Sequence, residues 1–298
     1  MPTVDLSQLP QPAIIEALDF EVILAEIKQF MISRFPEELR PAVAAALELE
    51  SEPLNIIAQA FAWRELLLRQ RINDGAAACM LSHSVSTDLD NIASNMGTRR
   101  LVITPATDTT DAVMESDTAL RMRAQAAFDG LSVAGPTGAY EYFAKSASGN
   151  VADAKAVSPS PAVVVISVLS TEGDGTATPE LLATVKDALS AEDRRPVGDR
   201  LTVQSAEIVN YNINARLFFY PGPESEPIQN AAHDALQAWI TLQGKIGRDV
   251  ARSAIMAALH VQGIQRVELT EPATDIVISD TQAARCASVT LEKGGTDE

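Results

Sequence analysis

The side chains best suited to metal binding or acid–base chemistry are few and scattered in this sequence. The three histidines, His83, His233 and His260, fall in different predicted elements, and none has a His or Cys partner at the spacing of a zinc site. Cys79 precedes His83 by one helical turn, but the two further ligands that zinc requires are missing. A surface or core pair is therefore favoured over a ligand pair.

Two groups of closely spaced carboxylates resemble possible reaction or metal sites. Asp88 and Asp90 lie in the sequence Thr87-Asp88-Leu89-Asp90, which resembles a capping box that opens a short helix. Glu48, Glu50 and Glu52 suggest the acid pair of a glycosidase, but they precede a predicted helix, and acidic residues stabilise the positive end of its dipole. Structural roles are therefore favoured for both groups.

Glycine-rich segments offer no nucleotide-binding motif. Gly135-Pro136-Thr137-Gly138 lacks the Gly-Lys-Ser/Thr ending of a phosphate loop, and Gly173-Asp174-Gly175 lacks the further glycine of a dinucleotide fingerprint. A Gly-x-Ser-x-Gly nucleophile elbow is also missing. The sequence thus predicts no catalytic, cofactor-binding or metal-binding residue, and no cofactor.

Composition narrows the class of partner. The 298 residues carry a formal net charge of -17, which argues against binding nucleic acid or an anionic membrane surface. Solubility explains this charge better than a partner specific for acidic surfaces does. The chain has no apolar run of the roughly 20 residues that a membrane span needs, and no secretory signal. Both cysteines are expected to be reduced, in a protein that stays on the cytoplasmic side.

The first hundred residues are predicted to be helical. Asp19 is a predicted N-cap, and the strongest helix runs from Pro53 to Ile72 with Ser51 as its cap. An apolar stripe recurs on this helix at Leu54, Ile57, Ala58, Phe61 and Leu68. A helix of this length needs a partner for its stripe, and a neighbouring domain and another chain remain equally open from the residues alone.

Two further regions follow a Thr-, Pro- and Asp-rich segment without apolar periodicity, predicted as a linker at residues 105–111. We expect a helical region at 1–104, a middle domain at 112–200 and a C-terminal domain at 201–298. The mixed order of strands and helices predicts an α+β fold, with hairpin-rich sheets in the last two regions. The predicted elements after the linker are helices at 116–128, around Tyr140, after Thr178, and at about 224–242 and 249–260, and strands at 151–157, 162–169, 201–205, 207–220, 267–269, 276–278 and 288–291.

Segments along nearly the whole chain resemble the baseplate J-like family of contractile-tailed bacteriophages. They are Met1 to Pro10, Leu47 to Pro53, Arg64-Glu65, Arg69 to Arg71, Glu115 to Arg123, Thr137 to Tyr140, Asp199 to Tyr211, Tyr220 to Glu224 and Gly263 to Thr270. No single segment is diagnostic, but their order over most of the length is specific.

This resemblance implies a structural baseplate-wedge protein of the virion tail, made and assembled in the host cytoplasm. The implied partners are a second copy of the chain, other wedge proteins, the central spike or hub, and sheath-initiating proteins. The family contributes no catalytic residues, and its ring rearrangement triggers sheath contraction. Leu54, Ile57, Phe61 and Leu68 then become the candidate inter-subunit surface. The alternatives are a tail-associated peptidoglycan hydrolase and a J-like protein from a prophage or bacteriocin cluster.

Overall fold

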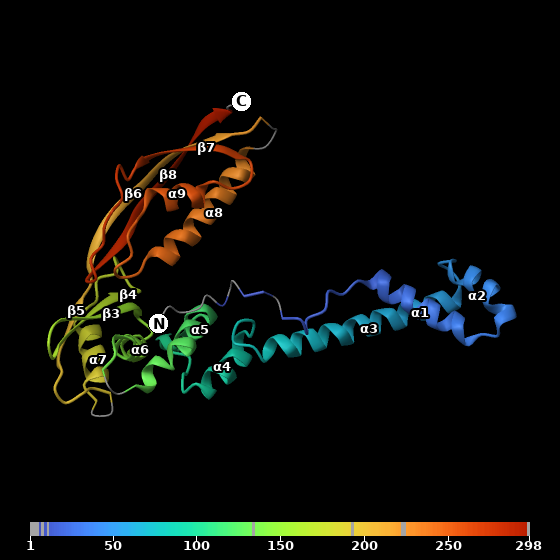
Figure 1. The fold of residues 1–298 in the computed structure, drawn as a ribbon, viewed down its shortest axis with the longest axis horizontal. Coiled ribbons are helices and arrows are strands. Elements are labelled where there is room, and N and C mark those ends of the chain that lie inside the picture. The colour runs from blue at the N-terminus through green and yellow to red at the C-terminus, as the bar shows by residue number, and fades with distance from the viewer. Residues whose placement is uncertain are drawn as a thin grey trace. The chain divides into compact units, whose positions relative to one another are not determined.

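The structure is a computed structural model that describes residues 6, 9–10, 12–132, 135–191, 194–221 and 225–296. It divides into two compact units, residues 2–99 and 100–298. The first unit is helical and the second contains all the β-strands of the described residues, so the expected α+β class is confirmed (Figure 1).

The helical unit is built on two packed helices, α1 and α3. Its elements are α1 (Phe20–Arg34), the short 3₁₀ helix η2 (Glu37–Leu39), α2 (Arg40–Leu47), α3 (Pro53–Ala78) and α4 (Ser86–Asn95). The Asp19 carboxylate accepts hydrogen bonds from the Glu21 and Val22 amides, so the predicted cap of α1 is confirmed. Gly97 has a φ of 69°, and this left-handed conformation ends α4 as the sequence predicted.

The second unit contains two three-stranded sheets and a short β-ribbon. Its elements are β1 (Val102–Thr104), β2 (Val113–Met114), α5 (Asp117–Ala126), η3 (Asp129–Leu131), α6 (Thr137–Ala147), β3 (Val151–Ser160), β4 (Val163–Ser170), α7 (Pro179–Leu189), β5 (Arg200–Ser205), β6 (Glu207–Phe219), α8 (Ser225–Gln243), α9 (Arg252–Leu259), β7 (Ile264–Glu271) and β8 (Gln282–Thr296). The strand orders are β3-β4-β5 and β7-β6-β8, while β1 pairs with β2.

Each large sheet has one parallel and one antiparallel contact. The central strand β4 pairs antiparallel with β3, as the predicted hairpin requires, and parallel with β5. In the second sheet, β6 pairs antiparallel with β7 and parallel with β8. Helices α8 and α9 cover one face of this second sheet (Figure 1). The buried side chains Ile166 and Val168 confirm that β4 is central to its core.

The two sheets are joined by a nearly continuous strand. Only Ala206 separates β5 from β6. The Ala206 amide donates to the Val168 carbonyl at 2.8 Å, and the next amide, that of Glu207, donates to Thr281 at 3.0 Å. The backbone thus changes sheets within two consecutive residues.

Four local predictions are wrong. Helix α3 has Glu52 at its N-cap without a side-chain bond, so Ser51 is not the cap. The predicted capping box at Thr87 lies inside α4, which begins at Ser86. Apolar spacing from Leu120 and Ala124 predicts that Leu131 continues the buried face of the helix at 116–128, but Leu131 is 77% exposed. Residues 276–278 are no strand, because only Ile276 forms a bridge, with Val250.

The expected linker, residues 105–111, connects the paired strands β1 and β2, whereas the chain divides between Arg99 and Arg100. The threefold division at 1–104, 112–200 and 201–298 stays a prediction.

Candidate functional site

One side of α3 forms the core of the helical unit. Ala58 and Ala62 are fully buried and pack with Ile23 and Leu24 of α1. Alanine presents only a methyl group, so the two helix axes can approach closely here. Ala58, which the sequence pattern grouped with the apolar stripe, therefore belongs to the interior of the subunit.

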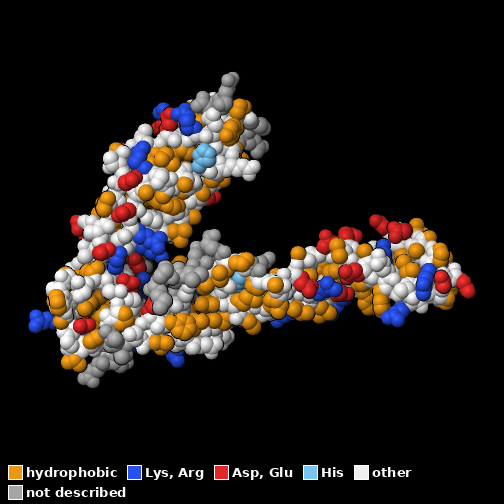
Figure 2. All heavy atoms as spheres, viewed as in Figure 1, with side chains coloured by type: hydrophobic (Ala, Val, Ile, Leu, Met, Phe, Trp, Pro, Cys, Tyr) orange, Lys and Arg blue, Asp and Glu red, His pale blue; other side chains and the backbone are white. Residues whose placement is uncertain are grey.

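Three of the other four residues of the predicted stripe are exposed to solvent. Ile57, Phe61 and Leu68 are 48%, 62% and 60% exposed, and Leu54 is partly buried. Ile72, at the expected end of the predicted helix, extends this surface. We name Leu54, Ile57, Phe61, Leu68 and Ile72 the α3 stripe; Figure 2 shows hydrophobic side chains at the surface of the helical unit.

A second exposed apolar row lies elsewhere on α3. It consists of Ile56, Trp63 and Leu67, and Phe30 on α1 is also exposed. The sequence reasoning missed this row because it followed a single stripe. The signal was present, because α3 carries large apolar residues around most of its circumference, which is typical of a helix covered on several sides. Clustered exposed apolar side chains mark protein-binding surfaces more often than isolated ones do.

Two salt bridges involve three charged residues of the Glu115–Arg123 segment, namely Glu115, Asp117 and Arg123. The Arg123 guanidinium binds Glu115 at 2.9 Å (Nε–Oε1) and 2.6 Å (Nη2–Oε2), and both side chains are 7% exposed. Arg100 contacts Asp117 at 2.7 Å and donates to the Glu115 carbonyl. Ser116 caps α5 through the Ala119 amide, as predicted. These residues fix the β1–β2 ribbon to α5 rather than forming a reaction site.

The Thr137–Tyr140 segment also has a structural role. The Tyr140 hydroxyl donates to Asp199 Oδ2 at 2.7 Å, and burial, followed by this hydrogen bond, raises the pKa of Tyr140. Next to it, Glu141 accepts the Ala156 amide of β3 at 3.2 Å. Burial is the main cause that raises the pKa of Glu141. Helix α6 is thus attached to both the 196–199 loop and the sheet.

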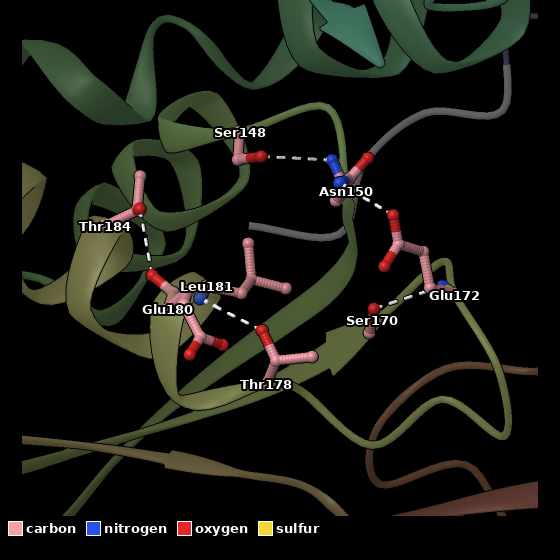
Figure 3. A pocket seen from close by; sticks show the side chains of 8 residues that line it. All are labelled: Ser148, Asn150, Ser170, Glu172, Thr178, Glu180, Leu181 and Thr184. Carbon is pink, nitrogen blue, oxygen red and sulfur yellow. Dashed lines mark hydrogen bonds between the residues drawn. The ribbon is translucent and has the colours of Figure 1, made fainter. Parts of the chain in front are cut away.

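A cavity of ≈ 220 Å³ lies between the residues that precede β3, the end of β4 and the start of α7, and it bears on the hydrolase alternative because it contains carboxylates. Two carboxylates line it, Glu172 and Glu180. In Figure 3 they lie on opposite sides of the pocket, with Leu181 between them. Glu172 accepts a hydrogen bond from Asn150, and Glu180 lies in the first turn of α7. The hydrogen bond from Asn150 and the position at the positive end of a helix dipole are structural roles that account for the two carboxylates.

The remaining candidate ligands stay apart. His83 lies in the turns after α3, where its Nδ1 contacts Ser82 Oγ at 2.7 Å, His233 is on the exposed side of α8, and His260 ends α9. The described residues contain no cluster of three or more His, Cys, Asp or Glu side chains able to hold a metal ion. In the same part of the chain, no helix has the length and apolar character of a membrane span.

Comparison with known proteins supplies the family. The baseplate J-like N-terminal domain matches residues 50–107, the baseplate J-like central domain matches 132–205 and the baseplate J-like protein C-terminal domain matches 211–292. Baseplate protein J of Escherichia phage P2 is 56% identical over 302 residues, covering 100% of both chains.

Among solved structures, a chain of the anti-feeding prophage (AFP) baseplate is similar to 61% of this chain at 14% identity, with a TM-score of 0.42. The match spans 43% of that chain. The resemblance expected from the sequence is confirmed by the three domain matches and by the full-length relative, and this chain belongs to the baseplate J-like family.

Proposed function

We propose that this chain is a structural subunit of the baseplate of a contractile tail, and that it acts by binding other protein chains rather than by catalysing a reaction. The name of its full-length relative, Baseplate protein J, supports the structural role. Structural roles account for the two carboxylates of the ≈ 220 Å³ cavity, so this cavity gives the peptidoglycan-hydrolase alternative no specific support.

The observation that carries the proposal at residue level is the exposure of the α3 stripe. Phe61 and Leu68 are each at least 60% exposed although the neighbouring Ala62 is fully buried. Removing one large apolar side chain from water stabilises an interface by about 1.5–3 kcal/mol. The stripe is therefore our candidate contact with a second copy of the chain or with another baseplate-wedge protein. The exposed row of Ile56, Trp63 and Leu67 offers a second contact on the same helix.

The wider assembly follows from the same proposal. Copies of the chain join a wedge, the wedges close a ring around the central spike or hub, and sheath-initiating proteins bind this ring. Rearrangement of the ring then releases sheath contraction. Assembly takes place in the host cytoplasm, and the finished protein resides in the virion baseplate.

Sedimentation of Phe61→Asp and Leu68→Asp variants tests the stripe. Each variant should remain folded by circular dichroism but lose concentration-dependent assembly, since a charge at the contact must be dehydrated. Ala183→Asp introduces the same charge at an exposed position of α7, away from both exposed rows of α3, and should still assemble. Unfolding of the Asp variants, or assembly unchanged by them, would contradict the assignment.

The response to salt concentration distinguishes self-association from binding to a basic partner. Because each copy carries a formal charge of -17, copies repel one another at low ionic strength. Raising salt to shorten the Debye length from about 30 to about 8 Å should strengthen self-association and weaken binding to a basic wedge protein. Clearing of cell walls by the purified protein would instead favour the hydrolase.

A further inference from the structure

A cavity of ≈ 390 Å³ opens in the second unit, between the β1–β2 ribbon, α5 and the start of β3. This volume lies in the range of small-ligand sites. Apolar side chains form much of its wall, namely Leu101, Ile103, Met114, Met122 and Val151. Met114 and Met122 are 44% and 41% exposed, so an approaching ligand can reach them.

Four charged side chains in the cavity wall form two ion pairs. Arg123 is bound to Glu115, as described above. Lys145 Nζ lies 2.9 Å from Asp153 Oδ1, and the other carboxylate oxygen, Oδ2, accepts the Ile246 amide at 3.0 Å. Neither carboxylate is thus free of partners inside the protein.

Lys245 is the unmatched charge. It follows α8, lines the cavity and is partly buried. Among the described residues, no acceptor lies within hydrogen-bond or ion-pair distance of its ammonium group. Burial lowers the pKa of Lys245, Arg248 and Lys145 lower it further, and Asp153 partly opposes them. A cation that loses water without gaining an acceptor is costly, so an incoming anion would be stabilised here.

We propose that this cavity binds a carboxylate carried on an apolar segment of another protein chain, with Lys245 as the donor to the carboxylate and the apolar wall holding the segment. A single unmatched positive charge suits a single negative charge better than the nearly double charge of a phosphate. The carboxylate comes from an Asp or Glu side chain or from a chain's C-terminus. The choice of a protein ligand rests on the proposed function, whereas the site itself does not.

Binding of a peptide to the cavity can be followed through the resonances of the methionine methyl groups. With all seven methionines labelled at the ε-methyl carbon, acetyl-Leu-Glu-Leu-amide should shift the Met114 and Met122 resonances. Met256, which packs against the core of the β7-β6-β8 sheet, should not move. The neutral acetyl-Leu-Gln-Leu-amide should bind about tenfold more weakly, because the charged hydrogen bond is lost. Acetyl-Leu-Leu with a free C-terminus reports whether a terminal carboxylate serves as well.

A charge-matched pair of variants identifies the donor. Lys245→Gln should weaken binding of the Glu peptide by about tenfold, while Lys186→Gln, which removes an exposed lysine of α7, should leave it unchanged. Unmoved Met256 and Met31 resonances establish that each variant is folded. Equal binding of the Glu and Gln peptides, unchanged binding to Lys245→Gln, stronger binding of inorganic phosphate, or no shift at millimolar peptide would overturn the proposal. These outcomes are independent of assembly through the α3 stripe, which is measured by sedimentation.

Discussion

Arg123 on α5 and Glu115, which follows β2, form a two-point ion pair that is almost completely removed from solvent. Glu115 Oε2 also accepts the Leu101 amide at 3.1 Å, and Arg123 donates to Ser146 on α6 at 3.2 Å. The pair therefore connects the ribbon, α5 and α6. Its members belong to one of the segments that resemble the family, and their role is to hold the fold together.

Arg123→Met should lower the free energy of unfolding by about 3–5 kcal/mol, because it leaves the Glu115 charge buried without its partner. The double variant Glu115→Gln/Arg123→Met should recover part of this loss, since it removes the charge and retains an acceptor for the Leu101 amide. Denaturant unfolding measures both. Arg69→Met, at the surface pair with Glu65, is the control and should have a much smaller effect. If Arg123→Met is as stable as the wild type, the buried ion pair does not stabilise the fold.

Ala62→Leu should destabilise the helical unit by about 1–3 kcal/mol, because Ala62 is completely buried between α3 and α1 and the larger side chain overpacks the contact. Ala60→Leu changes the same helix in the same way at an exposed position and should alter stability by less than about 0.5 kcal/mol. Thermal unfolding of the two variants measures the difference. Equal stability of both would place Ala62 outside the core.

Because of Glu141, we expect the stability of the folded protein to decrease as pH rises. Burial raises its pKa from 4.5 in the folded state, so between 4.5 and that higher value the folded chain binds more protons than the unfolded chain. The free energy of unfolding therefore falls as pH increases through this window, and Glu141→Gln should flatten the fall. Denaturant midpoints at several pH values test this. Glu180→Gln, an exposed change, should keep the wild-type slope, and a slope unchanged in Glu141→Gln would count against it.

Limited proteolysis should first cut within residues 105–111. All of these side chains are exposed, and few backbone hydrogen bonds hold the segment besides the Thr107 amide donating to the Thr110 carbonyl. Mass spectrometry of the first fragments locates the cut. An initial cut inside the central strand β4, at residues 163–169, would contradict the predicted domain organisation.

Elements with local signals could be predicted from the sequence. Asp19, Ser116 and Thr178 cap the helices expected of them, because an N-cap depends on residues only two or three positions away. Ser51 and Thr87 are also residue types that favour an N-cap, but neither of them caps a helix. At the start of α3, the side-chain amide of Asn55 donates a hydrogen bond to the Leu49 carbonyl at 3.0 Å. At the start of α4, Ser86 has a φ of 52°. At both places the helix therefore starts next to the predicted cap instead of at it.

Long-range contacts were harder to predict. The pairing of β4 with β5 and the place of Lys245 in the wall of the ≈ 390 Å³ cavity depend on how distant segments pack. The buried ion pair of Arg123 could have been predicted from the sequence. Arg123 shares a helix face with the buried residues Leu120 and Ala124, and an arginine at such a position requires a buried partner. For the α3 stripe, periodicity predicted the positions, but only the structure separates exposed Phe61 from buried Ala58.

The single residue between β5 and β6 has a mechanical consequence. Because Ala206 leaves no slack between the two sheets, a pull on β6 reaches β5 through extended backbone. Each strand lies parallel to a neighbour, β5 to β4 and β6 to β8, so such a pull loads many hydrogen bonds together in shear instead of opening them one at a time. The junction is therefore stiff along the strand axis. Force applied to one sheet is transmitted to the other before either one unravels.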